Sequence, residues 1–378
     1  MSKKIAQGAY GCVYKPSLSC TDRSFGSSDK YVSKLVSTNT AREEEIMMNK
    51  IRRIDPNGIF HYPLVKRCNY DNRPYDCPSN EDDEDQDVEL LIYEAGGKDM
   101  QEYIEREKIV DLKKFYLGLW KLFFGLFVMH NNDYYHHDIK PGNIMVNFTK
   151  SEYDIRYIDF GFFNSREELE DMLSTYQLDW FFQGYAFHPF EATFLTSKYM
   201  NLQFPPKSTP ERKAQIMTET LKDSSRDIRF KFMQYVDIYP KLASYFSRAR
   251  SRYDDLLDKD CVMMIDQETG RLKPQVIYSR IDVFMLGLTL KGLITTIRDS
   301  SPFGSDLLFT DHLDRLADDM NDVNISNRIG PFKAFRRYIK IVKDIYKIDI
   351  SDKMVSALKM IPEARHRKLL QKLQHDNA

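Results

Sequence analysis

The stretch that decides the fold is His-His-Asp-Ile-Lys-Pro-Gly-Asn at residues 136–143, followed by the apolar run Ile-Met-Val at 144–146. A second motif, Ile-Asp-Phe-Gly at 158–161, comes after a short loop and another apolar stretch. The alternative to an active-site loop is a polar loop that holds two aspartates by chance. The order and spacing of the motifs, with apolar strands beside them, favour the active-site loop.

The side chains of these motifs are those that phosphoryl transfer requires. That reaction needs a carboxylate to orient the nucleophile, oxygen ligands for Mg²⁺, and positive charge near the moving phosphoryl group. Asp138 can accept the proton of an attacking hydroxyl, and Lys140 can lie near a γ-phosphate. Asn143 and Asp159 supply the hard oxygen ligands that Mg²⁺ prefers. The two motifs therefore predict a phosphotransferase.

The N-terminal part adds a glycine turn and a lysine. Gly8 and Gly11 flank a turn between two predicted strands, and they would let the backbone approach phosphate oxygens. Most turns of this pattern bind nothing, so the turn alone is a weak signal. Lys34 lies in the strand pattern of residues 31–36, where a lysine commonly faces solvent. A functional lysine needs an anionic partner to orient it.

That partner is predicted on the next helix. Residues 40–54 place apolar side chains at helical spacing, which gives the helix one apolar face. Glu44 borders this face, whereas Glu43 and Glu45 are the surface alternatives. A Lys34–Glu44 ion pair is therefore expected, and it would hold the lysine ammonium against phosphate charge.

Together the motifs resemble those of the eukaryotic-type protein kinase superfamily, over nearly the whole chain. The similar stretches are the glycine-rich loop IAQGAYGCV (5–13), the lysine strand YVSK (31–34), the catalytic loop HHDIKPGN (136–143), the magnesium motif IDFG (158–161) and HPFE (188–191), which closes the activation segment. Asp282 in IDVFMLG matches the buried helix aspartate that braces the catalytic loop. Arg365 in IPEARHR matches the late arginine that pairs with Glu191. The resemblance implies a two-lobed α+β kinase fold, with a small N-terminal β-rich lobe and a large, mainly helical C-terminal lobe.

The resemblance also implies the cofactors ATP and Mg²⁺ and the residues that hold them. Glu94 and Gly96 would offer backbone groups to adenine, next to a bulky Tyr93. The implied ATP-binding residues are Ile5, Ala6, Gly8, Gly11, Val13, Val32, Lys34, Glu94, Gly96 and Met145. The implied catalytic residues are Asp138, Lys140, Lys34 and Glu44, and the implied Mg²⁺ ligands are Asn143 and Asp159.

Three residues depart from the pattern of this superfamily. Ala6 replaces the first glycine of the loop, which would stiffen the turn. His137 replaces the arginine that commonly receives an activation-loop phosphate, and a mostly neutral histidine would do so poorly. Gly184 stands where many serine/threonine kinases carry a threonine. We therefore expect activity that does not require phosphorylation of the activation segment.

The chain is expected to form one catalytic domain, with an N-lobe at residues 1–95 and a C-lobe at 96–378. A buried strand is predicted at 88–94 and a core helix at 112–130, and a further apolar helix opens at Ile281. About ninety residues, 192–281, form an insertion that is either extra packing or a docking platform for a partner. This insertion and the short N-terminus are similar to divergent kinases of large DNA viruses.

Bulk properties limit the partners and the location. The formal net charge of the 378 residues is -1, which argues against nucleic acid and anionic membranes as partners. No apolar run is long enough to cross a bilayer. The five cysteines are scattered and odd in number, which favours free thiols and a cytoplasmic location, in the host cytoplasm or the virion if the chain is viral.

The function predicted from these observations is a serine/threonine protein kinase that transfers the γ-phosphate of Mg-ATP to the hydroxyl of a protein substrate. Lys140 favours the serine/threonine pattern over the tyrosine-kinase pattern. Two alternatives remain at this point. One is a small-molecule phosphotransferase of related fold, and the other is a catalytically inactive kinase-like scaffold.

Overall fold

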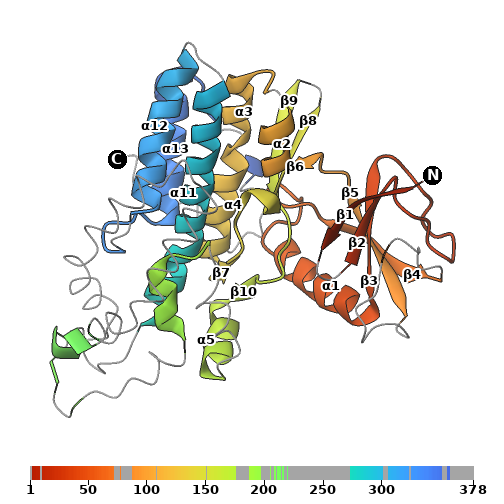
Figure 1. Cartoon of the computed structure of the whole chain (residues 1–378), viewed down its shortest axis with the longest axis horizontal. Helices are drawn as coiled ribbons and strands as arrows, with labels where there is room; N and C mark the ends of the chain where they lie inside the picture. The colour runs from red at the N-terminus through yellow and green to blue at the C-terminus, as the bar shows by residue number, and fades with distance from the viewer. Residues whose placement is uncertain are drawn as a thin grey trace. The chain divides into compact units, whose positions relative to one another are not determined.

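The computed structural model describes residues 2–8, 11–71, 77, 87–107, 109–149, 151–175, 187–196, 205, 208–209, 211–213, 215–216, 219, 273–300, 305–322, 325–350 and 356–357 (Figure 1). The chain divides into two compact units. The first unit comprises Met1–Asp99, Ile144–Gly161 and Lys353–Ala378, and the second comprises Met100–Asn143 and Phe162–Asp352.

The first unit is built on an antiparallel five-stranded sheet of order β1-β2-β3-β5-β4 (Figure 1). The strands are β1 (Lys3–Gly8), β2 (Gly11–Lys15), β3 (Tyr31–Ser37), β4 (Leu64–Tyr70) and β5 (Val88–Glu94). The helix α1 (Thr38–Arg52) follows β3 directly, because the side chain of Ser37 caps its first turn. Its apolar face buries Ala41, Met48 and Ile51, as the spacing predicts.

A smaller sheet of order β6-β8-β9 completes the described part of the first unit. Its strands are β6 (Lys98–Asp99), β8 (Ile144–Thr149) and β9 (Glu152–Tyr157). Gly97 leads into β6 with a positive φ of 86°, and a Cβ there would overlap the carbonyl oxygen of Val146. Only glycine tolerates this combination without strain, so the close approach of β6 to β8 depends on it.

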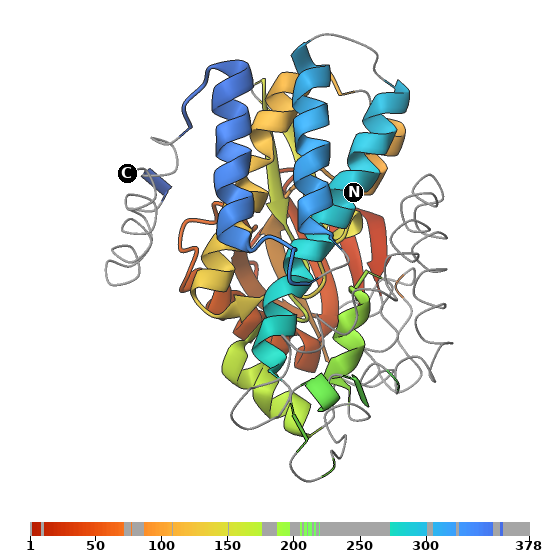
Figure 2. The same cartoon turned by 90° about the vertical axis from the view of Figure 1, so that its left-hand side faces the viewer.

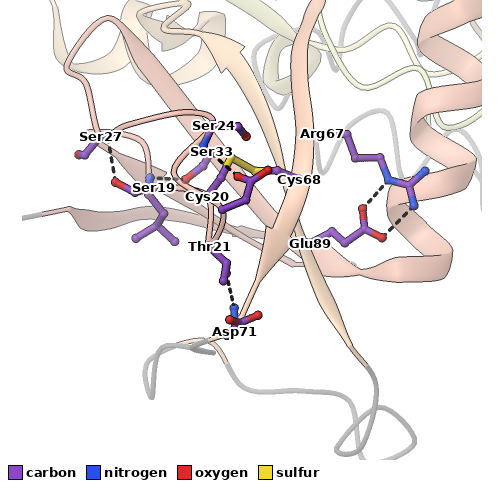
Figure 3. Close-up of a disulfide and its surroundings, with 12 residues drawn as sticks. Ser19, Cys20, Thr21, Ser24, Ser27, Ser33, Arg67, Cys68, Asp71 and Glu89 are labelled. Atoms are coloured by element: carbon purple, nitrogen blue, oxygen red, sulfur yellow. Dashed lines mark hydrogen bonds and ion pairs between the residues drawn. A yellow bond between two sulfur atoms is a disulfide. The ribbon is translucent and has the colours of Figure 1, made fainter.

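Two disulfides correct the expectation that all the cysteines are free. Cys12 is bonded to Cys77, with a Cα–Cα separation of 5.9 Å. Cys20 is bonded to Cys68, with a Cα–Cα separation of 5.8 Å (Figure 3). Cys20–Cys68 fastens the loop after β2 to β4, and the amide of Thr21 beside it donates to the carbonyl of Asn69. The pairing escapes a sequence argument because β-sheet formation, not spacing along the chain, brings the partners within bridging distance.

The second unit is mainly helical. Its elements are α2 (Met100–Arg106), α3 (Leu112–Gly118), α4 (Trp120–Asn131), β7 (Tyr134–Tyr135), η2 (Pro141–Asn143), β10 (Asn164–Ser165), α5 (Arg166–Ser174), η3 (Phe190–Leu195), α11 (Pro274–Ser300), α12 (Ser305–Met320) and α13 (Pro331–Tyr346). Figure 2 shows α11, α12 and α13, coloured teal to dark blue, side by side. Stacked rings join α4 to α13, with 4.4 Å between the ring centroids of Phe123 and Tyr338.

Two helix boundaries differ from the sequence prediction. The predicted helix 112–130 is divided into α3 and α4 at Leu119, whose amide donates to the carbonyl of Tyr116 in a tighter turn. The helix expected to open at Ile281 begins earlier, at Pro274, because proline is well suited to a first helical turn.

The structure describes only part of the predicted insertion, and what it shows of membrane-spanning helices holds for the described residues alone. Of residues 192–281, the structure describes 192–196, a few positions between 205 and 219, and 273–281, so the docking-platform interpretation lies largely outside the described residues. Among the helices that are described, none is long and apolar enough to span a membrane.

Candidate active site

Several residues that are predicted to face a nucleotide share one face of the sheet in the first unit. Strand register places Ala6 opposite Val13, Val13 opposite Lys34, and Val32 opposite Tyr93. Directly opposed residues, and residues two apart along a strand, point to the same face of a sheet. The predicted adenine-pocket side chains and the predicted phosphate lysine therefore face the same way, although their contact with ATP stays a prediction.

The predicted ion pair of the first unit is present. Lys34 Nζ lies 2.6 Å from Glu44 Oε2. Of the alternatives, Glu45 binds Arg67 at 2.8 Å and Glu43 is exposed. The structure thus selects Glu44 among three consecutive glutamates, as the apolar face of α1 predicted.

The second oxygen of Glu44 has a partner that sequence reasoning missed. The Tyr93 hydroxyl, at the end of β5, donates to Glu44 Oε1 at 2.7 Å. Burial raises the pKa of Tyr93 well above its ordinary value, and the negative charges of Glu44 and Asp159 act in the same direction. The phenol therefore stays protonated and remains a hydrogen-bond donor at neutral pH.

The two loop glycines have different surroundings. A Cβ at Gly11 would overlap the carbonyl oxygen of Leu35, so this glycine permits the close contact of β2 with β3. A Cβ at Gly8 would meet no atom of the described residues within 4 Å. The tip of the loop, residues 9–10, lies outside the described residues, and Ile5 at its start is 54% exposed.

The last residue of β5 and the segment that follows it carry the predicted hinge groups. Glu94 is exposed, whereas Gly96 is buried, and a Cβ there would come within 3.1 Å of the Tyr62 ring and 3.2 Å of the Met145 Cβ. Met145, predicted to contact the adenine ring, therefore lies beside the predicted hinge glycine. Because glycine has no Cβ, Gly96 lets Tyr62 and Met145 pack against the backbone without a tight contact.

Asp159 and the residue after it are held by local structure. Asp159 has a left-handed φ of 57°, a conformation that is uncommon outside glycine and concentrates at functional sites. Phe160 is buried against His61, with 6.1 Å between ring centroids in an edge-to-face arrangement. His61 Nδ1 in turn lies 2.7 Å from Asp55 Oδ2. Sequence reasoning did not identify the Asp55–His61 pair, because neither residue belongs to a motif.

The second unit holds the predicted catalytic aspartate in a set of hydrogen bonds. Lys140 Nζ lies 3.0 Å from Asp138 Oδ1 and 3.1 Å from Oδ2. The amide nitrogen of Asn143 donates to Asp138 Oδ2 at 2.6 Å and to the Asp138 carbonyl at 2.9 Å. Because the amide nitrogen is used in this way, the Asn143 side-chain oxygen is the atom left to ligate a cation.

Asp282 of α11 holds the backbone of this loop through hydrogen bonds, as predicted. Its carboxylate accepts from the backbone amides of His136 and His137 at 2.8 and 2.7 Å, and it lies 3.0 Å from His130 Nε2. Burial opposes ionisation, but the bond to His130 and the neighbouring histidines hold the pKa of Asp282 well below its ordinary value. A buried, ionised aspartate therefore fixes the backbone just before Asp138.

His137 occupies the position where the superfamily commonly has arginine. It is buried with a left-handed φ of 59°, and His188 Nε2 donates to its carbonyl at 2.9 Å. Burial lowers the pKa of His137 to about 4, although the charge of Asp282 acts in the opposite direction. Its side chain is therefore neutral at physiological pH and poorly suited to bind a phosphate group.

One predicted pairing is not tested, because Arg365, the predicted partner of Glu191, lies outside the described residues. Within the described part of the chain, the buried Glu191 pairs with Arg328. Both side chains of the Glu191–Arg328 pair are 0% exposed. Arg328 Nε also donates to the Asp322 carbonyl at 2.9 Å. The sequence signal was weak, because Arg328 stands alone just before α13, without a motif around it.

The predicted site residues are thus distributed over the two units. Lys34, Glu44 and Asp159 belong to the first, with Lys34 and Glu44 in contact. Asp138, Lys140 and Asn143 belong to the second, where all three are in contact. Gly184 lies outside the described residues.

Comparison with known proteins agrees with this geometry. Residues 1–182 match the family model of the protein kinase domain. A stretch of 78 residues is 31% identical to the serine/threonine-protein kinase ATG1c of Arabidopsis thaliana, and it covers 21% of this chain and 11% of that protein. The chain therefore spans only about a tenth of the length of this relative. The fold is α+β, with an N-terminal β-sheet lobe and a helix-rich C-terminal region, as in the two-lobed protein kinase fold.

Proposed function

We propose that this chain is a serine/threonine protein kinase that transfers the γ-phosphate of ATP to a protein hydroxyl. The observation that carries the proposal is the arrangement around Asp138. Its carboxylate contacts both Lys140 and Asn143, on a loop whose backbone is bound by Asp282. A scaffold without activity has no need of a buried carboxylate held beside an ammonium in this way.

Each residue has a distinct chemical role in the proposal. Asp138 orients the substrate hydroxyl and accepts its proton, while the Lys140 ammonium offsets the charge on the phosphoryl group. Lys34, oriented by Glu44, holds the phosphates that are not transferred. Preorganised charges of this kind lower the barrier because they need no rearrangement during the reaction.

The residues present also fit magnesium. Mg²⁺ usually takes one or two protein oxygens and completes its shell with water and substrate phosphates. Asn143 and Asp159 each carry such an oxygen, and because they belong to different units, their joint binding of Mg²⁺ is part of the proposal. Among the described residues, no group of three or more acidic, histidine or cysteine side chains could hold a metal ion. When bound, Mg²⁺ would neutralise phosphate charge.

The finer features of the proposal concern substrate, origin and location. Lys140 and the similarity to a plant serine/threonine kinase support serine or threonine as the acceptor. The proposed partner is a protein substrate, and the 192–281 insertion is a candidate docking segment. We propose a viral origin from the insertion and the short N-terminus, and we propose a cytoplasmic or virion location. Free thiols do not support that location, because four of the five cysteines are paired.

The test is transfer of labelled γ-phosphate from Mg-ATP to generic protein substrates, with the modified residues mapped by mass spectrometry. We expect wild-type transfer to serine or threonine, and a loss of at least about a hundredfold in Asp159→Asn, since this change removes a carboxylate ligand. Asp29→Asn, which alters an exposed loop aspartate of the same unit, is the matched control and should be unchanged. Background signals from wild type and both variants would overturn the proposal, whereas transfer to small hydroxyl compounds alone would favour a small-molecule phosphotransferase.

A further inference from the structure

Glu44 is bound at both carboxylate oxygens. Lys34 Nζ lies 2.6 Å from Oε2, and the Tyr93 hydroxyl donates to Oε1 at 2.7 Å. The three residues come from β3, α1 and β5 of the same unit, and the strand register puts Lys34 and Tyr93 on one face of the sheet. Glu44 therefore lies at the centre of a three-residue arrangement, with Lys34 on one carboxylate oxygen and Tyr93 on the other.

The two donors constrain Glu44 differently. A lysine ammonium is a compact point charge with rotatable donors, so by itself it can follow either carboxylate oxygen. A tyrosine hydroxyl on a rigid ring, placed at the end of a strand in mid-sheet, can reach only one position. Because it occupies Oε1, it leaves Oε2 for Lys34 and stops the carboxylate from turning.

The surroundings favour a lasting hydrogen bond. Lys34 and Glu44 have side chains that are 28% and 23% exposed, so water competes only partly for their charges. A hydrogen bond to a charged acceptor is stronger than one between neutral groups. The hydroxyl of Tyr93 remains a donor at neutral pH, so this contact does not depend on a titration in that range.

We propose that Tyr93 is a positioning residue for phosphoryl transfer: its hydroxyl fixes the carboxylate of Glu44 and, through it, the ammonium of Lys34. The inference rests on the proposed kinase function. The competing explanation is that Glu44 merely accepts a hydrogen bond from a partly buried hydroxyl, in which case turnover would not depend on that hydroxyl.

The experiment compares Tyr93→Phe with wild type in the full-length chain, with steady-state kinetics at varied ATP. This change removes the hydroxyl and keeps the ring. We expect kcat to fall about tenfold, with the KM for ATP changed by less than about threefold, because the ammonium is misplaced and not lost. Tyr70→Phe removes a hydroxyl of β4 in the same unit and should leave both constants unchanged. Thermal unfolding without nucleotide shows that each variant is folded.

A double-mutant cycle tests whether the hydroxyl acts through Glu44. In a Glu44→Ala background, where it has no carboxylate to fix, Tyr93→Phe should lower the residual single-turnover rate by less than about twofold. An equal, roughly tenfold loss in both backgrounds, or an unchanged kcat in Tyr93→Phe, would overturn the inference while the kinase proposal stands. A wild-type chain that transfers no phosphate would instead overturn the kinase proposal, and the inference with it.

Discussion

The buried Glu191–Arg328 pair provides the sharpest test of how the second unit is stabilised. Both side chains are inaccessible to solvent, and the Arg328 guanidinium also lies over the Phe284 ring, 4.8 Å from its centroid. Replacing Arg328 with Met removes the cation and keeps much of the volume. Glu191 would then be a buried carboxylate that has lost the cation paired with it, which is far more costly than losing an exposed ion pair.

The expected loss is about 3–5 kcal/mol of unfolding free energy, the usual cost of removing one partner of a buried pair. In a unit of this size that corresponds to a fall in midpoint temperature of roughly 6–20 °C. Replacing Glu191 with Gln in the Arg328→Met background removes the orphaned charge and should restore a large part of the loss. Arg106→Met is the matched control, because Arg106 is 71% exposed in its pair with Glu102. It should cost less than about 0.5 kcal/mol.

The assay is thermal and urea unfolding of the full chain, followed by circular dichroism and intrinsic fluorescence. A loss below about 1 kcal/mol in Arg328→Met would refute the reasoning. So would a large loss in Arg365→Met together with none in Arg328→Met, because the sequence-based pairing would then be the correct one.

Two further predictions concern the thiols and the activation segment. When the chain is denatured without reductant, one of its five cysteines should react with a thiol reagent. Reduction of the disulfides should lower the unfolding free energy of the first unit by about 2–5 kcal/mol. Five reactive thiols before reduction would contradict the disulfides. Combined replacement of Ser174 and Thr175 by Ala and of Ser165 by Asn should retain at least about half of wild-type turnover, since the buried, neutral His137 is a poor phosphate receptor. Asn is chosen at 165 because Ser165 caps α5, and complete loss of activity in a folded variant would sink this prediction.

Local patterns were sufficient to predict several elements of this protein, although not all of their boundaries. The strand at Val88–Glu94 matches the predicted range, and α1 begins two residues before the predicted start because Ser37 provides an N-cap. The choice of Glu44 over its neighbours followed from helical periodicity alone. Such features depend on residues close together in sequence, and their physical causes, capping and amphipathic spacing, can be read directly from it.

Other features were decided only by the tertiary structure. The disulfide partners, the choice of Arg328 for Glu191, and the hydrogen bond from Tyr93 to Glu44 each join residues at least 48 positions apart. No local periodicity identifies such partners, because any of several cysteines, arginines or tyrosines satisfies the same chemistry. Burial selects among them: a carboxylate removed from water takes whichever cation or donor the packed strands and helices bring within reach.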